Sequence, residues 1–306
     1  MSGSGGAVAP PASRTTMLGF GFAIASFLIW ALFPVYFKQL ESVPVVEVLA
    51  HRVVWGVVFT AALLTFLGRW GAIAVGFASP RLVGALTLST LTISLNWGVF
   101  IWAVSHDRVL DSSLGYYINP LVSVLLGVVV LHERLRAGQW AAVALAGIGV
   151  GSEVLGQGEV PWIPLTLACS FAAYGLIRKM TDVDPLTGLF IEILIASPVA
   201  LGYLLLVAQA EATNGLFPAG DARTTILLVM AGVLTVLPLL LFTGAARRIR
   251  LSTLGLLQYI VPTGQFLIAV YVYGEPLSHR RVVTFVCIWI ALLIYSLQSL
   301  RDRPYA

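Results

Sequence analysis

Three ionisable side chains lie well inside apolar segments of this chain: His51, Arg52 and Glu192. A charge placed in hydrocarbon costs at least about 2.5–3.5 kcal/mol unless it is paired or hydrated. Two kinds of chemistry would account for such residues. They form structural ion pairs, or they bind and release protons, since histidine titrates near neutral pH and burial can bring a carboxylic acid into the same range.

Other charged residues supply partners for structural pairs. Glu47 precedes the histidine by four positions, which places both on one face of a helix. We expect Asp111 to reach Arg52, and Arg178 to hold Glu192. In the alternative interpretation, Glu192 is a proton-linked gate, with the histidine as a second candidate. The sequence shows no distinct sodium site.

A second group of residues suits the binding of a small organic molecule. Amide and hydroxyl groups at mid-depth in a membrane require partners, which a substrate or cavity water supplies. Aromatic faces stack on planar solutes and attract cations. For each aromatic residue the alternative is ordinary helix packing. The candidate substrate-binding residues are Trp30, Asn96, Trp97, Tyr116, Tyr117, Asn119, Tyr174, Gln258, Tyr259 and Gln265.

The elements that carry these residues are apolar segments of membrane-spanning length. The chain of 306 residues is 58% hydrophobic and only 10% charged, whereas soluble domains carry about 25% charged residues. Its apolar runs are near 20 residues long, which matches a hydrocarbon core of about 30 Å. We therefore predict an all-α integral membrane protein with ten transmembrane helices. They span 17–37, 45–67, 82–104, 109–131, 138–156, 161–178, 186–208, 224–246, 251–273 and 281–300.

An internal repeat divides these spans into halves. The tetrad Tyr117–Pro120, followed by Glu133, returns 142 residues later as Tyr259–Pro262, followed by Glu275. A common spacing of half the chain indicates a duplication. Five spans in each half place the second copy in the membrane from the opposite side, which suits alternating access.

The predicted halves are 17–156 and 161–300, which together form one membrane domain. Residues 1–16 are predicted to be a disordered cytoplasmic segment. Pro120 and Pro262 fall near the middle of spans four and nine, where each should bend its helix and belong to the gating machinery.

The register that matches Pro44 to Pro185 makes His51 and Glu192 equivalent positions in the two halves. The two side chains should lie at mirrored depths in the membrane, not side by side. Each is therefore a gating candidate on its own, together with Arg52.

The two repeated glutamates, Glu133 and Glu275, each precede the next predicted helix. We expect them to cap the N-terminus of that helix or to pair with nearby arginines. His132 and Glu133 could begin a zinc-protease motif, but Arg136 stands where the second histidine is needed. No metal site and no cofactor are predicted.

Basic residues set the expected orientation. With the N-terminus in the cytoplasm, 12 of the 18 Lys and Arg residues lie in cytoplasmic segments and 5 lie outside. Both termini are therefore predicted to be cytoplasmic. This excess of Lys and Arg in the cytoplasmic segments also explains the net positive charge of the chain, so that charge is no argument for binding nucleic acid.

Eight short motifs are the most distinctive parts of the sequence: Leu28–Trp30, Pro34–Lys38, His51–Val53, Asn96–Trp97, Phe100–Val104, Leu114–Leu121, Leu251–Gly255 and Gln258–Ile260. They resemble the RarD proteins of the EamA branch of the drug/metabolite transporter superfamily. The resemblance implies ten helices from two EamA repeats, a bacterial plasma-membrane permease and an association with chloramphenicol sensitivity. The usual glycine before the repeated glutamate is present as Gly274 but is replaced by His132 in the first copy.

These observations favour a secondary transporter that exports a small amphipathic solute, with protons as a further candidate partner. Its other partners would be the lipid bilayer and, through the small-residue spacing of Gly147 and Gly151, a second copy of the chain. Two alternatives stay open. One is a membrane enzyme, which the short connections and the lack of catalytic motifs disfavour; the other is a scaffold or receptor that transports nothing.

Overall fold

The structure is a computed structural model that describes residues 14–77, 79–132, 137–157, 160–210, 221–246, 248–249 and 257–301. Within these ranges every regular element is helical, as the sequence predicts. The elements are α1 (Arg14–Ala31), α2 (Phe33–Lys38), α3 (Val45–Phe66), α4 (Trp70–Phe77), α5 (Pro80–Ser105), α6 (Val109–Leu131), α7 (Ala137–Gln157), α8 (Trp162–Met180), α9 (Pro185–Ala210), α10 (Ala222–Ala246), α12 (Ile260–Leu267), the π-helix η1 (Ile268–Val272) and α13 (His279–Arg301).

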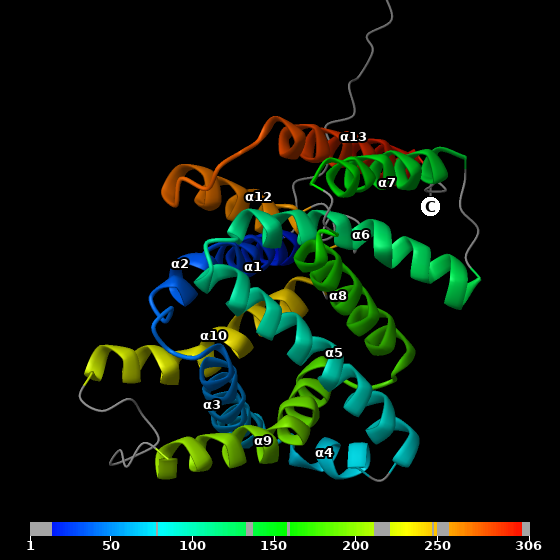
Figure 1. The fold of residues 1–306 in the computed structure, drawn as a ribbon. Helices are drawn as coiled ribbons and strands as arrows, with labels where there is room; N and C mark the ends of the chain where they lie inside the picture. The colour runs from blue at the N-terminus through cyan, green and yellow to red at the C-terminus, as the bar shows by residue number, and fades with distance from the viewer. Residues whose placement is uncertain are drawn as a thin grey trace, which may run out of the picture.

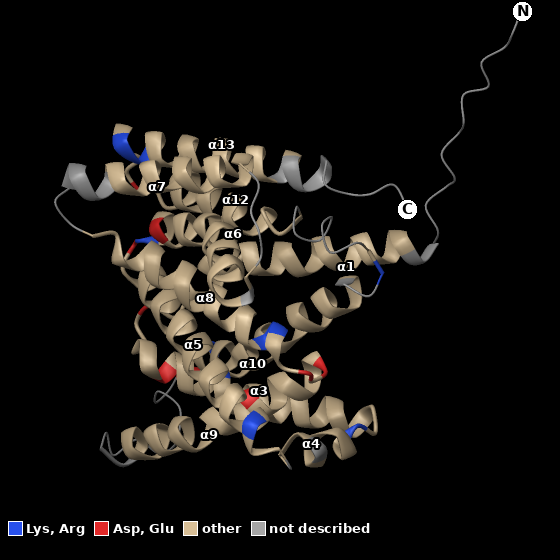
Figure 2. Ribbon diagram, turned by 90° about the vertical axis from the view of Figure 1, so that its right-hand side faces the viewer, with Lys and Arg blue, Asp and Glu red and all other residues tan. Residues whose placement is uncertain are grey.

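Within the described ranges, six helical segments are long and apolar enough to cross a bilayer. They confirm the predicted spans one to four, seven and eight, while α7, α8 and α13 cover three further predicted spans. The full count of ten crossings stays a prediction. Figure 2 shows long helical stretches free of charge between short charged segments. The six segments are Thr16–Lys38, Val45–Phe66, Pro80–Ser105, Val109–Val130, Pro185–Ala208 and Ala222–Ala245.

The first predicted span is interrupted by a proline. Pro34 lies in the first turn of α2 and has no N–H to donate to the carbonyl of Trp30, four residues back. That carbonyl accepts instead from Nε2 of Gln265 on α12, at 3.4 Å. The break between α1 and α2 therefore ties the first repeat to the second.

The connection between α3 and α5 contains the short helix α4, which the sequence analysis did not predict. Helix α3 ends at Phe66, and Gly68 follows the C-cap Leu67 with a φ of 63°, a left-handed conformation that favours glycine. The N–H of Arg69 returns to the carbonyl of Leu64 at 3.0 Å and that of Gly68 to Thr65 at 3.2 Å. This closing motif turns the chain sharply, so a separate helix follows.

The ninth predicted span differs from a single bent helix. Its described part turns at Gln258 and Tyr259, and α12 begins only at the next residue. Pro262 thus lies in the first turn of α12, where no intrahelical donor is lost, and the prediction that it bends the middle of a helix is wrong. Pro120 does lie inside α6. The carbonyl of Pro262 accepts from Oγ of Ser113 on α6 at 2.8 Å.

Helix pairing follows the duplication. Helix α1 packs on α10 and α12, and its counterpart α8 packs on α5 and α6, which are the counterparts of α10 and α12. Likewise α3 packs on α10 and α9 on α5, while α7 pairs with α13 and α6 with α12, side by side in Figure 1. All of these pairs join one repeat to the other, so the repeats share one core.

Glycines allow two of these pairs to approach closely. A Cβ on Gly232 of α10 would overlap the backbone of Trp55 on α3. A Cβ on Gly115 of α6 would come within 2.9 Å of the Pro164 carbonyl on α8. Small residues at helix contacts are the usual device for close packing in membranes.

Glu275 caps a different helix from the one expected. Its carboxylate accepts from the N–H groups of Val109 and Leu110, at 2.7 and 2.8 Å, at the N-terminus of α6. The prediction that it caps the following helix, α13, is therefore wrong. Its counterpart Glu133 lies outside the described residues. In Figure 2, α13 runs toward the side on which α1 begins.

Candidate substrate cavity

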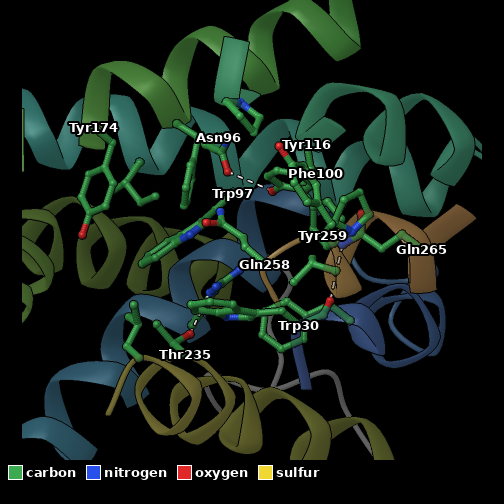
Figure 3. A pocket seen from close by; sticks show the side chains of 18 residues that line it. Trp30, Asn96, Trp97, Phe100, Tyr116, Tyr174, Thr235, Gln258, Tyr259 and Gln265 are labelled. Atoms are coloured by element: carbon green, nitrogen blue, oxygen red, sulfur yellow. Dashed lines mark hydrogen bonds between the residues drawn. The ribbon is translucent and has the colours of Figure 1, made fainter. Parts of the chain in front are cut away.

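A cavity of about 120 Å³ lies where the two repeats meet. Figure 3 shows its labelled side chains converging from helices of both halves. Its volume is close to the roughly 150 Å³ of a cavity that holds benzene. The lining consists of Trp30, Phe33, Arg52, Ile93, Asn96, Trp97, Phe100, Tyr116, Pro120, Phe171, Tyr174, Thr235, Leu239, Gln258, Tyr259, Val261, Pro262 and Gln265.

Helical periodicity explains how few helices supply so many lining residues. Helix α5 contributes Ile93, Asn96, Trp97 and Phe100, at intervals of three and four that share one face. Helix α6 contributes residues 116 and 120, α8 contributes 171 and 174, and α10 contributes 235 and 239, with the same spacing. Each of these helices presents one stripe to the cavity.

Asn96 joins three helices at the cavity wall. Its Nδ2 donates to the carbonyl of Leu167 and to Oγ of Ser170, both at 3.0 Å, on α8. Its Oδ1 accepts from the hydroxyl of Tyr116 on α6 at 3.1 Å. The amide is therefore fully engaged with protein, and it fixes the wall on which a solute would lie.

Arg52 is a buried cation at the cavity, with 4% of its surface exposed. Its Nε donates to Oγ1 of Thr235 at 2.7 Å. Its guanidinium carbon lies 4.0 Å from the ring centre of Trp97 and 5.6 Å from that of Phe33. Aromatic faces on several sides attract the cation and orient its plane.

The expected pair between Arg52 and Asp111 is wrong. Asp111 pairs with Arg108 at 2.7 Å and with Arg281 of α13 at 3.0 Å. Asp111 lies in the first turn of α6, whereas Arg52 lies two turns into α3, so depth along the helices separates them. In the described part of the chain, no carboxylate lies within ion-pair distance of Arg52.

Glu192 lies in a second and smaller space of about 10 Å³, which shares Ile93 and Trp97 with the larger cavity. Ser89 donates to its carboxylate at 2.5 Å, and the hydroxyl of Tyr174 donates at 3.4 Å. A guanidinium nitrogen of Arg178 lies 3.6 Å away, as the sequence analysis expected.

Eight of the ten predicted binding residues line the large cavity, and two do not. Tyr117 turns toward α12, where its hydroxyl lies 2.7 Å from that of Thr263. Asn119 donates to the carbonyl of Ala168 at 3.1 Å and fastens α6 to α8. Both are close in sequence to Tyr116, but steps of 100° per residue direct them to other faces of α6.

Of the other predicted gating residues, the two prolines line the cavity and the histidine does not. Pro120 and Pro262 line the cavity, one from each repeat. His51 is buried on α3, one turn after the buried Glu47, and neither belongs to the cavity lining. The structure therefore brings Arg52, but not its neighbour His51, to the cavity.

Sequence reasoning missed several lining residues. Ile93 and Phe100 could have been found from their helical spacing to Asn96 and Trp97. Nothing local distinguishes Thr235 and Leu239 from other residues of an apolar span. The residues missed are Phe33, Ile93, Phe100, Phe171, Thr235, Leu239 and Val261.

The fold and the cavity define a multi-pass helical membrane protein built from two related halves. Residues 17–152 and 160–297 each match the EamA-like transporter family, and the chain belongs to that family.

The sequence matches to related proteins cover nearly the whole chain. An uncharacterized transporter of Vibrio cholerae is 45% identical, over 95% of this chain and 96% of its own length. Protein RarD of Escherichia coli is 42% identical, over 94% and 97%. The chloramphenicol-sensitive protein RarD of Pseudomonas aeruginosa is 31% identical, over 94% and 96%. The resemblance to RarD proteins is thus confirmed.

A solved crystal structure shares the fold, with a TM-score of 0.59 and 19% sequence identity. The match covers 94% of this chain and 99% of that chain.

Proposed function

We propose that the protein is a secondary transporter that moves a small amphipathic organic solute across the bacterial plasma membrane. The observation that carries the proposal is the cavity at the junction of the repeats, lined by aromatic and amide side chains from both halves. A site at the interface of two related halves is where secondary transporters bind their substrates.

The proposed mechanism is alternating access by two inverted five-helix halves. The equivalence of the helix pairs supports it, because α1 packs on α10 in the same way that its counterpart α8 packs on α5. If one set of contacts loosens while the other tightens, the cavity opens to one side and then to the other. Ten crossings and cytoplasmic termini belong to this proposal.

Glu192 is the proposed proton-linked residue. It is 1% exposed, and it faces one basic group, Arg178, across 3.6 Å. Because Tyr174 donates to this carboxylate and also lines the cavity, a change at Glu192 reaches the substrate site through one shared side chain. Protonation would release both Arg178 and Tyr174 from a negative charge.

Flux in proteoliposomes tests transport and coupling together. Radiolabelled chloramphenicol is the first probe, because one relative is named for sensitivity to it. A panel of small aromatic solutes, with and without a pH gradient, follows. Flux above that of empty liposomes supports the proposal, and a panel that moves no faster than through empty liposomes in either direction overturns it.

Glu192→Gln in the same assay tests whether this residue couples transport to protons. The variant should retain exchange of solute across the membrane but lose acceleration by a pH gradient. Lys38→Gln, which removes a charge paired with Asp107 and Glu41, is the control and should keep the gradient response. Full gradient-driven flux by Glu192→Gln contradicts the coupling role.

Cysteine labelling tests the orientation. The native thiols, Cys169 and Cys287, are first replaced by serine. Single cysteines introduced at Ser2 and Ala306 should then react with an impermeant maleimide only after the cells are opened. Labelling of one end in intact cells contradicts an even number of crossings.

A further inference from the structure

The described lining of the central cavity includes one cationic side chain and no anionic one. Among the described residues that line it, Arg52 is the only charged group. Aromatic, aliphatic, hydroxyl and amide side chains make up the rest. A buried charge without a counter-ion is costly in a membrane, so it is retained where it has a task.

The guanidinium keeps most of its donors unused. Arginine carries five N–H donors, and in the described part of the chain its hydrogen bond runs from Nε to Thr235. Thr235 in turn donates to the carbonyl of Ala231 on α10 at 2.8 Å, which fixes the hydroxyl as an acceptor for Arg52. The terminal N–H groups are therefore held in place, ready for an acceptor in the cavity.

The carboxylate of Glu192, in the neighbouring small space, is already engaged. Glu192 lies in the small space beyond Ile93 and Trp97, where Ser89 and Arg178 contact it. Trp97 covers the guanidinium at 4.0 Å and lines both spaces. The indole thus lies between the two charged groups, and no carboxylate of the described residues pairs with Arg52 at the cavity.

The duplication does not explain this charge. In the register that matches Pro44 to Pro185, the counterpart of Arg52 is Ile193 in the second repeat. The cavity is therefore electrostatically asymmetric, although its aromatic lining comes from both halves. Such asymmetry suits a solute with one charged end and one aromatic or apolar end.

We propose that the solute is a small aromatic or apolar monocarboxylate, whose carboxylate binds the terminal N–H groups of Arg52. The inference rests on the proposed function and specifies the substrate class of the same site. Guanidinium and carboxylate match in a planar, two-bonded geometry. The remainder of the solute would lie against aromatic lining residues such as Trp30, Phe100 and Tyr259. A cavity of about 120 Å³ suits a single ring.

Three probes of one size and different charge test the class: phenylacetate, phenylacetamide and phenethylamine. Each is titrated against the purified full-length protein, and the shift in thermal unfolding gives the Kd. Phenylacetate should stabilise the protein against unfolding. The Kd of phenylacetamide should be at least about tenfold higher than that of phenylacetate, and the Kd of phenethylamine should be the highest. Equal stabilisation by the amide or the amine, or no stabilisation by phenylacetate, overturns the inference.

Variants then assign the preference to one residue. Arg52→Gln should raise the Kd of phenylacetate about 10- to 100-fold and leave that of the amide little changed. Lys38→Gln, which removes a cation outside the cavity, should leave the order of the probes intact. Unchanged selectivity in Arg52→Gln overturns the assignment. Should that variant not fold, Arg52→Lys decides, since it must still prefer phenylacetate to the amide.

Flux of the same probes separates this inference from the proposed function. Binding of phenylacetate through Arg52 without flux of any probe refutes transport and leaves the anion site standing. Flux of phenylacetamide or chloramphenicol without that of phenylacetate refutes the anion site and leaves transport standing.

Discussion

Gly188 on α9 controls how close Arg178 comes to Glu192. A Cβ at this position would overlap the guanidinium of Arg178, so Gly188→Ala must displace that group. Restoring ordinary contact distances requires a movement of roughly 2 Å. The substitution therefore stretches a buried ion pair without changing either charged residue.

The size of the effect follows from the geometry. With an effective dielectric constant of about 20, two unit charges at 3.6 Å attract by about 5 kcal/mol, and a further 2 Å removes about 1.5 kcal/mol. Alanine in a helix stabilises the folded state by about 0.5–1 kcal/mol relative to glycine, which partly offsets this loss. Gly188→Ala should therefore lower the free energy of unfolding by about 0.5–1 kcal/mol.

A second glycine of the same helix supplies the control. A Cβ on Gly202 meets nothing within 4 Å, so Gly202→Ala should show only the stabilisation that alanine gives a helix relative to glycine. The two variants should differ by about 1.5 kcal/mol in an SDS titration of the protein in mixed micelles, followed by tryptophan fluorescence. In a Glu192→Gln background the difference should vanish, because no ion pair remains. If Gly188→Ala stabilises as much as Gly202→Ala, or if its loss persists in the Glu192→Gln background, the reasoning is refuted.

Two further predictions concern packing and pH. Gly232→Ala should lower the free energy of unfolding by about 1–3 kcal/mol, because the new Cβ overlaps the backbone of Trp55. The control is Gly84→Ala, whose new Cβ would meet nothing within 4 Å. Equal thermal unfolding midpoints for the two variants contradict the prediction. Burial raises the pKa of Glu275 above its ordinary value of 4.5, so the folded state favours the protonated acid. The stability of the wild type relative to Glu275→Gln should therefore fall as pH rises above about 4.5, and parallel pH profiles contradict this.

Properties that depend on one segment were predictable from the sequence. Hydropathy and length located α3, α5, α6, α9 and α10 within a few residues, because a span needs only enough apolar residues to cross the bilayer. The duplication was also visible, since equal spacing survives when most residues have changed. The matches at 17–152 and 160–297 confirm the two repeats.

Contacts between distant segments were not predictable in the same way. Asp111 was expected to reach Arg52 from its depth in the membrane, but it pairs with Arg281 on α13. Glu275 was expected to cap the helix that follows it or to pair with nearby arginines, but it caps α6, 165 residues earlier in the chain. Neither the Asp111–Arg281 pair nor the cap on α6 could be deduced from depth or from nearness in sequence, because helix packing brings these residues together from different repeats.

The cavity was predictable in part for a physical reason. Polar and aromatic residues at mid-depth are unusual enough in a membrane span to indicate a site, and most of them do line it. The face of a helix cannot be deduced from depth alone, which is why Tyr117 and Asn119 were assigned to the cavity with Tyr116. Apolar lining residues such as Leu239 carry no signal, because hydrocarbon and cavity favour the same side chains.

The arrangement of three charged residues bears on the proposed anion selectivity of the cavity. Arg178 lies 3.6 Å from Glu192 on one side of Trp97, and Arg52 on the other side pairs with no carboxylate of the described residues. If Arg178 moved away, Glu192 would lose its basic partner, and the field of an unpaired carboxylate would reach Arg52 across a single indole ring. That field would compete with a bound anion for the guanidinium. Gly188→Ala should therefore weaken phenylacetate binding as well as folding, although residue 188 does not line the cavity; an unchanged Kd in that variant would show that the two charged sites are independent.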